Sequence, residues 1–449
     1  MIIKSKIIAT LAVLLSVFFA PSTFSQTYYP GVYVLGAVNK PISTTSNTQP
    51  FVAGGAIRIS WNTLEPSENV YDWSFLDNEI TTAQNTGKKV SISVFAGSRG
   101  TPAWLWNYPV MPFYYIDMNP YSSTYLDTLK LPLPYDTIYL AKLSDFLYAL
   151  GNHYASDTNI AYMRDASGMV TEGWGLATTD AYGNSWTVYN YSPDTLMYAY
   201  RKILDTYMAA FPFTSQWVEV GNISFEPAVS GNSKIYVAEQ MALYGFTNYS
   251  NRFNVWREDF SACFPDPPPS NSFWHILWDN PCHCGAQALS SVQDGGGTDC
   301  SFRMSQCDTI TACSKDTVLR RAIRRALDYK MPYLEIYKAD IMDVSLQSVL
   351  QQAADSLSVV CSQLTTLGVQ LNAREHELQI YPNPSGSKTT IEFSLAGTSQ
   401  VSIDIYNLLG EKVTAVENGI FSSGKHTAVF DAKNLQAGAY FIKGTSKNS

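Results

Sequence analysis

The sequence predicts an α/β fold, a (β/α)8 TIM barrel, followed by a small all-β domain built as an immunoglobulin-like sandwich. Two observations lead to this prediction. From about residue 29 to residue 371, short runs rich in β-branched and aromatic residues alternate with segments whose apolar residues recur at helical spacing. Beyond residue 378 the helical spacing stops and period-two alternation begins. Strands that alternate with helices favour a parallel sheet, and eight such units favour a closed barrel.

The barrel prediction depends on counting eight strands. They are predicted at residues 32–36, 56–60, 90–94, 160–165, 217–221, 253–256, 286–292 and 333–337. Helices are predicted at residues 75–86, 139–154, 193–210, 234–244, 317–329 and 345–357. An open doubly wound sheet is the alternative, but no glycine-rich phosphate loop follows the first strand. We therefore favour the barrel, with limits at residues 26–371.

The two ends of the chain differ from its middle. Lys4 and Lys6 precede an uncharged apolar run over residues 7–20, and small and polar residues follow it. This pattern is typical of a signal peptide, here residues 1–25, and an uncleaved anchor is the alternative. No later stretch is apolar enough to span a membrane, so we expect no transmembrane segment after signal cleavage. At the other end, a polar junction at 372–377 precedes the β-domain at 378–449.

Charge and cysteine content restrict the function. The net charge of −8, without a basic patch, argues against a nucleic-acid partner. Six of the seven cysteines fall in the loops at 263–313, and Cys361 stands apart. We expect disulfides of open connectivity, since export makes an oxidising compartment available. The alternative is a metal site at Cys282-His283-Cys284, but the spacing fits no common zinc pattern. We expect no metal and no cofactor.

Three short motifs carry a resemblance in the last domain. They are Tyr381-Pro382-Asn383-Pro384, then Ile405-Tyr406-Asn407-x-x-Gly410, then Leu435-x-x-Gly438-x-Tyr440. Their order is similar to that of the type A C-terminal sorting domain of the Bacteroidetes type IX secretion system. The resemblance implies that residues 378–449 bind the type IX machinery, and that the protein is secreted or held at the cell surface. An unrelated carbohydrate-binding sandwich is the alternative.

A second resemblance lies around the second and third predicted strands. Arg58-x-x-Trp61-x-x-x-Glu65-Pro66 is followed by Tyr71-Asp72-Trp73 and then by Pro102-x-Trp104-Leu105. This series resembles the opening half of retaining (β/α)8 glycoside hydrolases, in particular the β-galactosidase-like branch. The resemblance implies that Arg58 supports the catalytic carboxylates, while Glu65 and Asp72 fix a loop.

Flat aromatic rings beyond the strand ends suit a carbohydrate substrate. Large aromatics there can stack on the apolar face of a pyranose ring, although such residues also serve as core or lid. The candidates for substrate binding are Trp61, Trp104 and Trp174, with Trp106 beside them.

Hydrolysis of a glycosidic bond needs two carboxyl groups. The resemblance places the general acid/base at the end of strand four, where Glu172 is the match, although Thr171 precedes it in place of the usual asparagine. The family nucleophile is a glutamate at the end of strand seven, and the predicted strand seven offers no glutamate. If the strand count is off by one, Glu335 is the nucleophile. Behind it stand Asp294, Glu226 and Asp259.

Two functions remain open from the sequence. The first is a secreted O-glycoside hydrolase that acts on an oligo- or polysaccharide through Glu172 and Glu335. The second is a catalytically inactive barrel that binds glycans and serves as a surface adhesin or scaffold. The missing glutamate on strand seven favours the second.

Overall fold

The chain forms two compact units, residues 1–361 and residues 362–449. The computed structural model describes residues 29–42, 44–98, 100–118, 124–165, 180–221, 235–249, 252–292, 314–361, 379–381, 388–395, 397–406, 412–433, 435 and 440–448. The predicted signal peptide at 1–25 and the predicted junction at 372–377 lie outside these residues.

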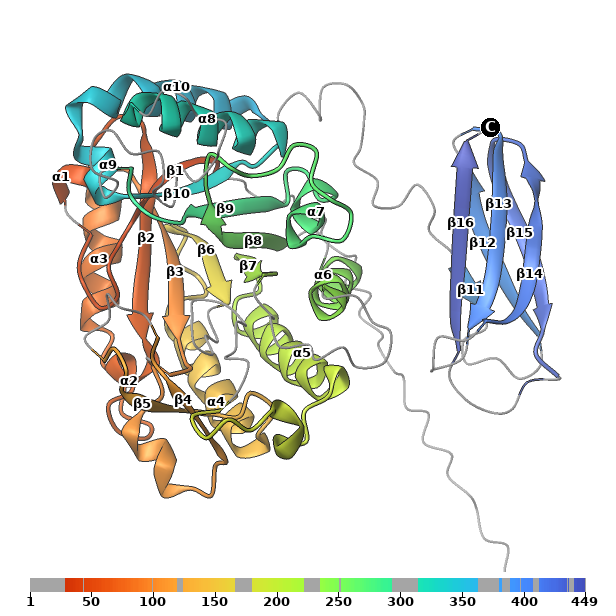
Figure 1. Ribbon diagram of the computed structural model, residues 1–449, viewed down its shortest axis with the longest axis horizontal. Helices are drawn as coiled ribbons and strands as arrows, with labels where there is room; N and C mark the ends of the chain where they lie inside the picture. Colours follow the sequence, from red (N-terminus) through yellow and green to blue (C-terminus); the bar gives the residue numbers. More distant parts are fainter. Residues whose placement is uncertain are drawn as a thin grey trace, which may run out of the picture. The chain divides into compact units, whose positions relative to one another are not determined.

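Eight parallel strands close into a barrel in the first unit (Figure 1). Strand β10 pairs with β1, with Tyr33 opposite Glu335, and this pairing closes the sheet. The closed barrel confirms the predicted (β/α)8 fold and excludes the open sheet. In chain order its strands are β1 (Gly31–Leu35), β2 (Val52–Ser60), β3 (Lys89–Phe95), β6 (Ile160–Asp165), β7 (Ser215–Glu219), β8 (Phe253–Phe260), β9 (Cys284–Ala288) and β10 (Tyr333–Tyr337).

Six long helices follow strands in the barrel, at the places that the periodicity predicts (Figure 1). Local capping explains where two of them begin: the Asp136 carboxylate accepts from two backbone N–H groups, and Ser192 forms a capping box with Thr195. The six are α3 (Ser74–Asn85), α4 (Thr137–Tyr154), α5 (Pro193–Ala210), α6 (Tyr236–Tyr249), α8 (Lys315–Asp328) and α10 (Gln347–Val359).

Several shorter elements were not predicted, because each is too short to show a period. An antiparallel hairpin, β4 (Pro112–Ile116) and β5 (Thr128–Pro132), lies in the connection from β3 to α4. The others are one-turn to two-turn helices, α1 (Thr44–Asn47), α2 (Trp61–Leu64), η1 (Ala103–Asn107), η2 (Trp186–Tyr189), α7 (Phe273–Trp278), α9 (Lys338–Met342) and η3 (Val344–Leu346).

An aromatic layer fills the inside of the barrel. The rings of Tyr33, Tyr162 and Trp217 lie around Tyr333, with centroid distances to it of 4.7, 5.1 and 5.0 Å. Gly285 on β9 makes room for them, because a Cβ there would stand 2.8 Å from the Trp217 ring and 2.9 Å from the Tyr333 carbonyl oxygen. The barrel is therefore a packed core and not a pore.

The second unit is a two-layer β domain. One sheet has the order β11 (Gln379–Tyr381), β12 (Lys388–Leu395), β15 (Gly424–Asp431), and the other β14 (Lys412–Phe421), β13 (Ser399–Tyr406), β16 (Phe441–Asn448). Inward side chains of both sheets share one core, to which β12 contributes Ile391 and Phe393 and β13 contributes Val401 and Ile403. The predicted change from helical to hairpin pattern is confirmed.

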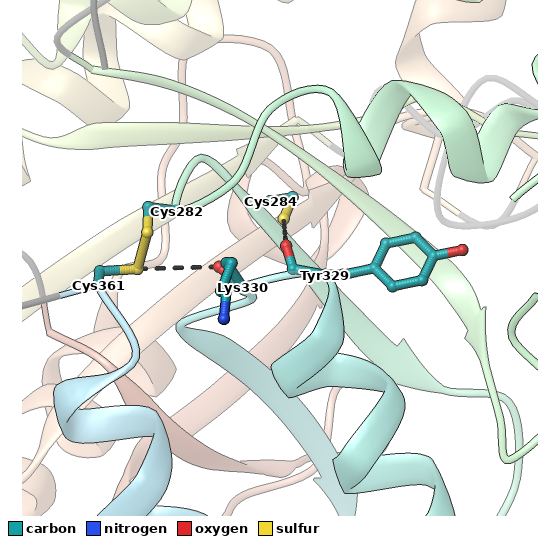
Figure 2. Close-up of a disulfide and its surroundings, with 5 residues drawn as sticks. All are labelled: Cys282, Cys284, Tyr329, Lys330 and Cys361. Carbon is teal, nitrogen blue, oxygen red and sulfur yellow. Dashed lines mark hydrogen bonds between the residues drawn. A yellow bond between two sulfur atoms is a disulfide. The ribbon is translucent and has the colours of Figure 1, made fainter. Parts of the chain in front are cut away.

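A disulfide joins Cys361, just after α10, to Cys282, just before β9 (Figure 2). The two residues are 79 positions apart, so the bond ties the end of the last helix back to the seventh barrel strand. Lys330 lies between them: its carbonyl oxygen accepts from the Cys282 N–H at 3.0 Å. Cys284 is a buried free thiol that donates to the Tyr329 carbonyl oxygen at 3.4 Å.

The disulfide confirms that the cysteines form disulfides, and Cys263 is disulfide-bonded as well. It also corrects the grouping of the cysteines, because Cys361 pairs with a member of the 263–313 cluster. Cys282 is consumed by this bond, so the alternative metal site at residues 282–284 loses one of its ligands. Among the described residues no helix is long and apolar enough to cross a membrane.

Replacing Cys282 and Cys361 together by alanine should lower the free energy of unfolding by about 2–4 kcal/mol, because the unfolded chain gains the entropy of a long open loop. Urea titration followed by tryptophan fluorescence measures it, since all ten tryptophans lie between residues 61 and 278. Cys284→Ala is the matched control and should lower the free energy of unfolding by less. A double variant as stable as the wild type would contradict this role of the disulfide.

Candidate functional site

The structure confirms the strand count, and this decides where Glu335 lies. Strand seven is β9, whose polar side chain is Gln287, and strand eight is β10, which carries Glu335. The off-by-one count that would bring Glu335 to the nucleophile position of the resembling family is therefore wrong. Glu335 sits one strand further on, paired in register with Gln287.

Glu335 is held by two donors inside the barrel. The Tyr333 hydroxyl donates to Oε1, and Arg164 Nη1 donates to Oε2 at 2.8 Å. Neither Arg164 nor Glu335 exposes any side-chain surface. Burial raises the pKa of Tyr333 well above its ordinary value, and the neighbouring Glu335 charge adds to the shift, so this tyrosine stays a proton donor.

Arg164 links four strands. It extends from β6, contacts Glu335 on β10, lies 3.3 Å from Gln287 Oε1 on β9, and has its guanidinium carbon 4.8 Å from the Trp256 ring centroid on β8. A planar cation with several donors suits this position, because it can satisfy an anion, an amide and an aromatic face together. The sequence analysis did not single out Arg164, although it is the charged residue near the end of predicted strand four.

The described substrate-binding candidates lie on β2, just after it and in η1. Arg58 is half-buried on β2 and its Nε donates to the Gly36 carbonyl oxygen at 2.6 Å. Trp61 is fully buried and packs edge-on against Trp104 at 5.7 Å, so it has no exposed ring surface for a sugar. Trp104 is half-buried in η1.

Glu65 and Asp72 fix the loop after β2, as the sequence predicts. Glu65 accepts from Trp61 Nε1 at 2.7 Å and from the Asn69 N–H at 2.8 Å. Asp72 accepts from the N–H and the hydroxyl of Ser74, the first residue of α3. These contacts place Trp61 and Trp104 against the same loop.

Several predicted residues lie outside the described residues. They are Glu172, the expected acid/base, Trp174, the third stacking candidate, and the two further carboxylates Asp294 and Glu226. The remaining alternative nucleophile, Asp259, is described: it accepts from Arg257 Nε at 2.8 Å.

Sequence reasoning missed a second buried charged group. Glu219 is the last residue of β7, fully buried, and its Oε1 accepts from the Gly221 N–H at 2.7 Å. Burial raises the pKa of Glu219 well above its ordinary value, against the opposing charge of Arg257. The signal that could have found it is an acidic residue near the carboxyl end of a predicted barrel strand. Across the residues that the structure describes, no cluster of three His, Cys, Asp or Glu side chains could hold a metal.

Removing one partner of the Arg164–Glu335 pair should destabilise the barrel strongly. We expect Glu335→Ala to lower the free energy of unfolding by about 3–5 kcal/mol, because it leaves a buried guanidinium without its counter-charge. Urea titration measures the loss. Arg324→Ala, which breaks an exposed pair with Asp328, is the control and should change stability by about 0.5 kcal/mol or less. Equal effects of the two variants would contradict a structural role for the buried pair.

Comparison with known families adds two matches. Residues 55–163 match the family described as β-galactosidase, and residues 379–449 match the secretion system C-terminal sorting domain. The first match spans β2 to β6, the region of the Arg58, Trp61 and Glu65 motif. The second spans the whole two-layer β domain. No curated protein matches the chain in a sequence search.

Solved structures with a similar arrangement include three carbohydrate-active enzymes. The catalytic domain of the β-amylase from Paenibacillus polymyxa has a TM-score of 0.48 and 8% identity over 72% of this chain and 98% of that chain. Xylanase B from Clostridium stercorarium F9 has a TM-score of 0.39 and 11% identity, over 68% and 85%. Xylanase 10B from Thermotoga petrophila RKU-1, solved with xylobiose, has a TM-score of 0.41 and 11% identity, over 69% and 82%. We draw no conclusion from likenesses this distant.

The sorting domain marks the chain for export across the outer membrane, to the surroundings or the cell surface. The β-galactosidase match lies within the closed barrel, and the sorting domain follows the barrel in the chain. The chain thus combines a closed eight-stranded barrel, of which residues 55–163 match the β-galactosidase family, with a secretion system C-terminal sorting domain.

Proposed function

We propose that this protein hydrolyses glycosidic bonds of an extracellular oligo- or polysaccharide with two carboxyl groups. The observation that carries the proposal is the match of residues 55–163 to the β-galactosidase family, on strands that do form part of a closed barrel. Because that family is described by its action on β-galactosides, a β-galactoside is the first substrate to test.

The proposed catalytic pair is Glu172 and Glu335, the latter on strand eight and not at the strand-seven position of the family nucleophile. Glu172 donates a proton to the leaving glycosidic oxygen while the Glu335 carboxylate bonds to the anomeric carbon. Water then hydrolyses this glycosyl ester, and Glu172 takes the proton of the attacking water. The donors on both Glu335 oxygens support this role, because they hold the carboxylate in one orientation.

Aromatic and basic side chains are proposed to bind the sugar. We assign this role to Trp104, Trp174 and Arg58. Trp104 retains exposed surface, which stacking on a pyranose requires. We further infer that the signal peptide at 1–25 delivers the chain across the inner membrane. The two sheets of the last unit are proposed to form an immunoglobulin-like sandwich, which binds the type IX machinery.

A second candidate function is favoured by two specific observations. Glu335 exposes no surface, so hydrolysis requires its carboxylate to become accessible when the glycan binds. Strand seven carries Gln287 where the family nucleophile is a glutamate. A barrel that binds glycans without cleaving them, as an adhesin or scaffold, needs neither an accessible Glu335 nor that glutamate.

Substitution of either carboxyl group by its amide separates the two candidates. We expect Glu172→Gln and Glu335→Gln each to lower kcat by about 10²–10⁴-fold on 4-nitrophenyl β-D-galactopyranoside, because each removes a proton or a bond-forming oxygen from the reaction. Spectrophotometric release of 4-nitrophenolate measures kcat, and a melting curve of each variant checks that it folds.

Glu79→Gln is the matched control, since Glu79 is also a buried glutamate that accepts from a backbone N–H, that of Ile42 at 2.7 Å. Its activity should equal that of the wild type. Unchanged turnover in Glu172→Gln would overturn the assignment of the acid. Binding of the glycoside by the wild type without any turnover would favour the adhesin or scaffold.

A further inference from the structure

Two buried charged groups lie together near the carboxyl ends of β7 and β8, outside the Arg164–Glu335 pair. Glu219 ends β7 and exposes no surface, and Arg257 on β8 exposes 3% of its surface. Both side chains closely approach Gly221. A Cβ at Gly221 would stand 2.0 Å from Arg257 Nη1 and 2.5 Å from Glu219 Oε1. The absence of a side chain at residue 221 therefore allows the two groups to approach each other.

Each group is anchored on one side only. Arg257 directs Nε and Nη2 at the Asp259 carboxylate, with Nε at 2.8 Å, and its guanidinium lies 5.2 Å from the Phe273 ring centroid. Glu219 Oε1 accepts from the Gly221 N–H. These contacts fix the direction of both side chains.

The other side of each group has hydrogen-bonding capacity that no described residue uses. Glu219 Oε2 and Arg257 Nη1 are both buried, and neither has a hydrogen-bond partner among the described residues. A buried polar atom without a partner costs free energy comparable to a lost hydrogen bond, so each such atom calls for an explanation, of which a bound partner is one. Both side chains approach Gly221 near the carboxyl ends of barrel strands, which is the end at which this fold binds its substrates.

The chemistry of the two atoms selects a ligand group. Arg257 Nη1 can only donate, so the ligand atom must accept from it. Glu219 Oε2 accepts when the carboxyl is ionised and donates when it is protonated. Burial raises the pKa of Glu219 well above its ordinary value, so the ligand group is chosen to fit either form. A hydroxyl group satisfies each case. Its oxygen accepts from Arg257. It also donates its hydrogen to the ionised Glu219 carboxylate, or accepts through its second lone pair from the protonated carboxyl. An ether oxygen or an ammonium group does not.

We propose that Glu219 and Arg257 form a binding pair for one hydroxyl group of the glycan, which makes them specificity-determining residues. The proposal rests on the proposed function, because a sugar is the ligand that presents hydroxyl groups to the barrel. Neither residue is assigned a part in bond cleavage. Asp259 acts through Arg257, as a positioning residue.

Full-length protein and three variants test the pair. Glu219→Gln keeps the shape and the acceptor for Gly221, Arg257→Lys shortens the donor, and Gly221→Ala displaces both groups while it leaves their charges in place. Binding is measured by calorimetry and hydrolysis by 4-nitrophenolate release, on the 4-nitrophenyl β-D-galactopyranoside, β-D-glucopyranoside and β-D-xylopyranoside. Glu79→Gln again serves as the control, and melting curves identify any variant that fails to fold.

We expect Kd or KM for the preferred glycoside to rise about tenfold or more in each of the three variants, since a hydrogen bond to a charged group is lost. Monodeoxy analogues of that glycoside provide the readout that a merely structural role would not change. In the wild type, removal of one particular hydroxyl should weaken binding about tenfold, and in Glu219→Gln the same removal should weaken it by less, because only the bond from Arg257 is then left to lose.

The outcomes separate this inference from the proposed hydrolysis. Hydrolysis by the wild type, with the same KM and the same response to the deoxy analogues in all folded variants, overturns the pair and leaves the hydrolase standing. Binding without hydrolysis, lost in the variants, overturns the hydrolase and supports the pair. A wild type that neither binds nor cleaves any of the three glycosides overturns both.

Discussion

The buried ion pair between Arg164 and Glu335 is the interaction on which the inside of the barrel depends. It joins strand four to strand eight across the interior, and the same guanidinium reaches Gln287 on strand seven and Trp256 on strand six. A charged pair without solvent is tolerated only when its donors and acceptors are well matched. Here the Tyr333 hydroxyl donates to the second carboxylate oxygen of Glu335. The ring of the same tyrosine belongs to the aromatic layer with Tyr33, Tyr162 and Trp217. The polar and aromatic parts of the interior are thus coupled through one side chain.

The disulfide between Cys282 and Cys361 fits the export of the protein. A protein that leaves the cell reaches an oxidising environment, where the Cys282–Cys361 bond can persist. That bond fastens the end of α10, the last helix of the barrel, to the chain just before β9. The barrel therefore carries its own covalent closure at the boundary of the first unit, residues 1–361. The β domain that follows has a separate core.

Most of the fold could be predicted from the sequence, whereas much of the candidate site could not. Eight apolar runs and six helical patterns produce elements long enough to show their period, and each lies where the pattern predicts it. The β4–β5 hairpin and the short α7 were not predicted, because they lie in connections between barrel strands and the alternation of strand and long helix does not require them. Cys361 lies far along the chain from Cys282, and spacing alone could not pair them.

For the site residues, too, the sequence predicts local contacts but not contacts between distant positions. Sequence patterns identify the loop that Glu65 fixes, since its contacts to Trp61 and Asn69 are local. They cannot show that Trp61 is buried, nor that Arg164 pairs with a residue 171 positions away. Glu219 and Arg257 lie on neighbouring strands, and only the closed sheet brings them together at Gly221. Contacts across the barrel are set by topology, which periodicity does not encode.

The stereochemistry of the first product tests the central claim, hydrolysis through a covalent intermediate on a carboxylate, most directly. Proton NMR of 4-nitrophenyl β-D-galactopyranoside during turnover distinguishes the anomer released first, before mutarotation mixes the two forms. Two carboxyl groups that act as acid and nucleophile predict release of the β-anomer, with retention. Initial release of the α-anomer would contradict the account, because inversion places water, and not a carboxylate, at the anomeric carbon.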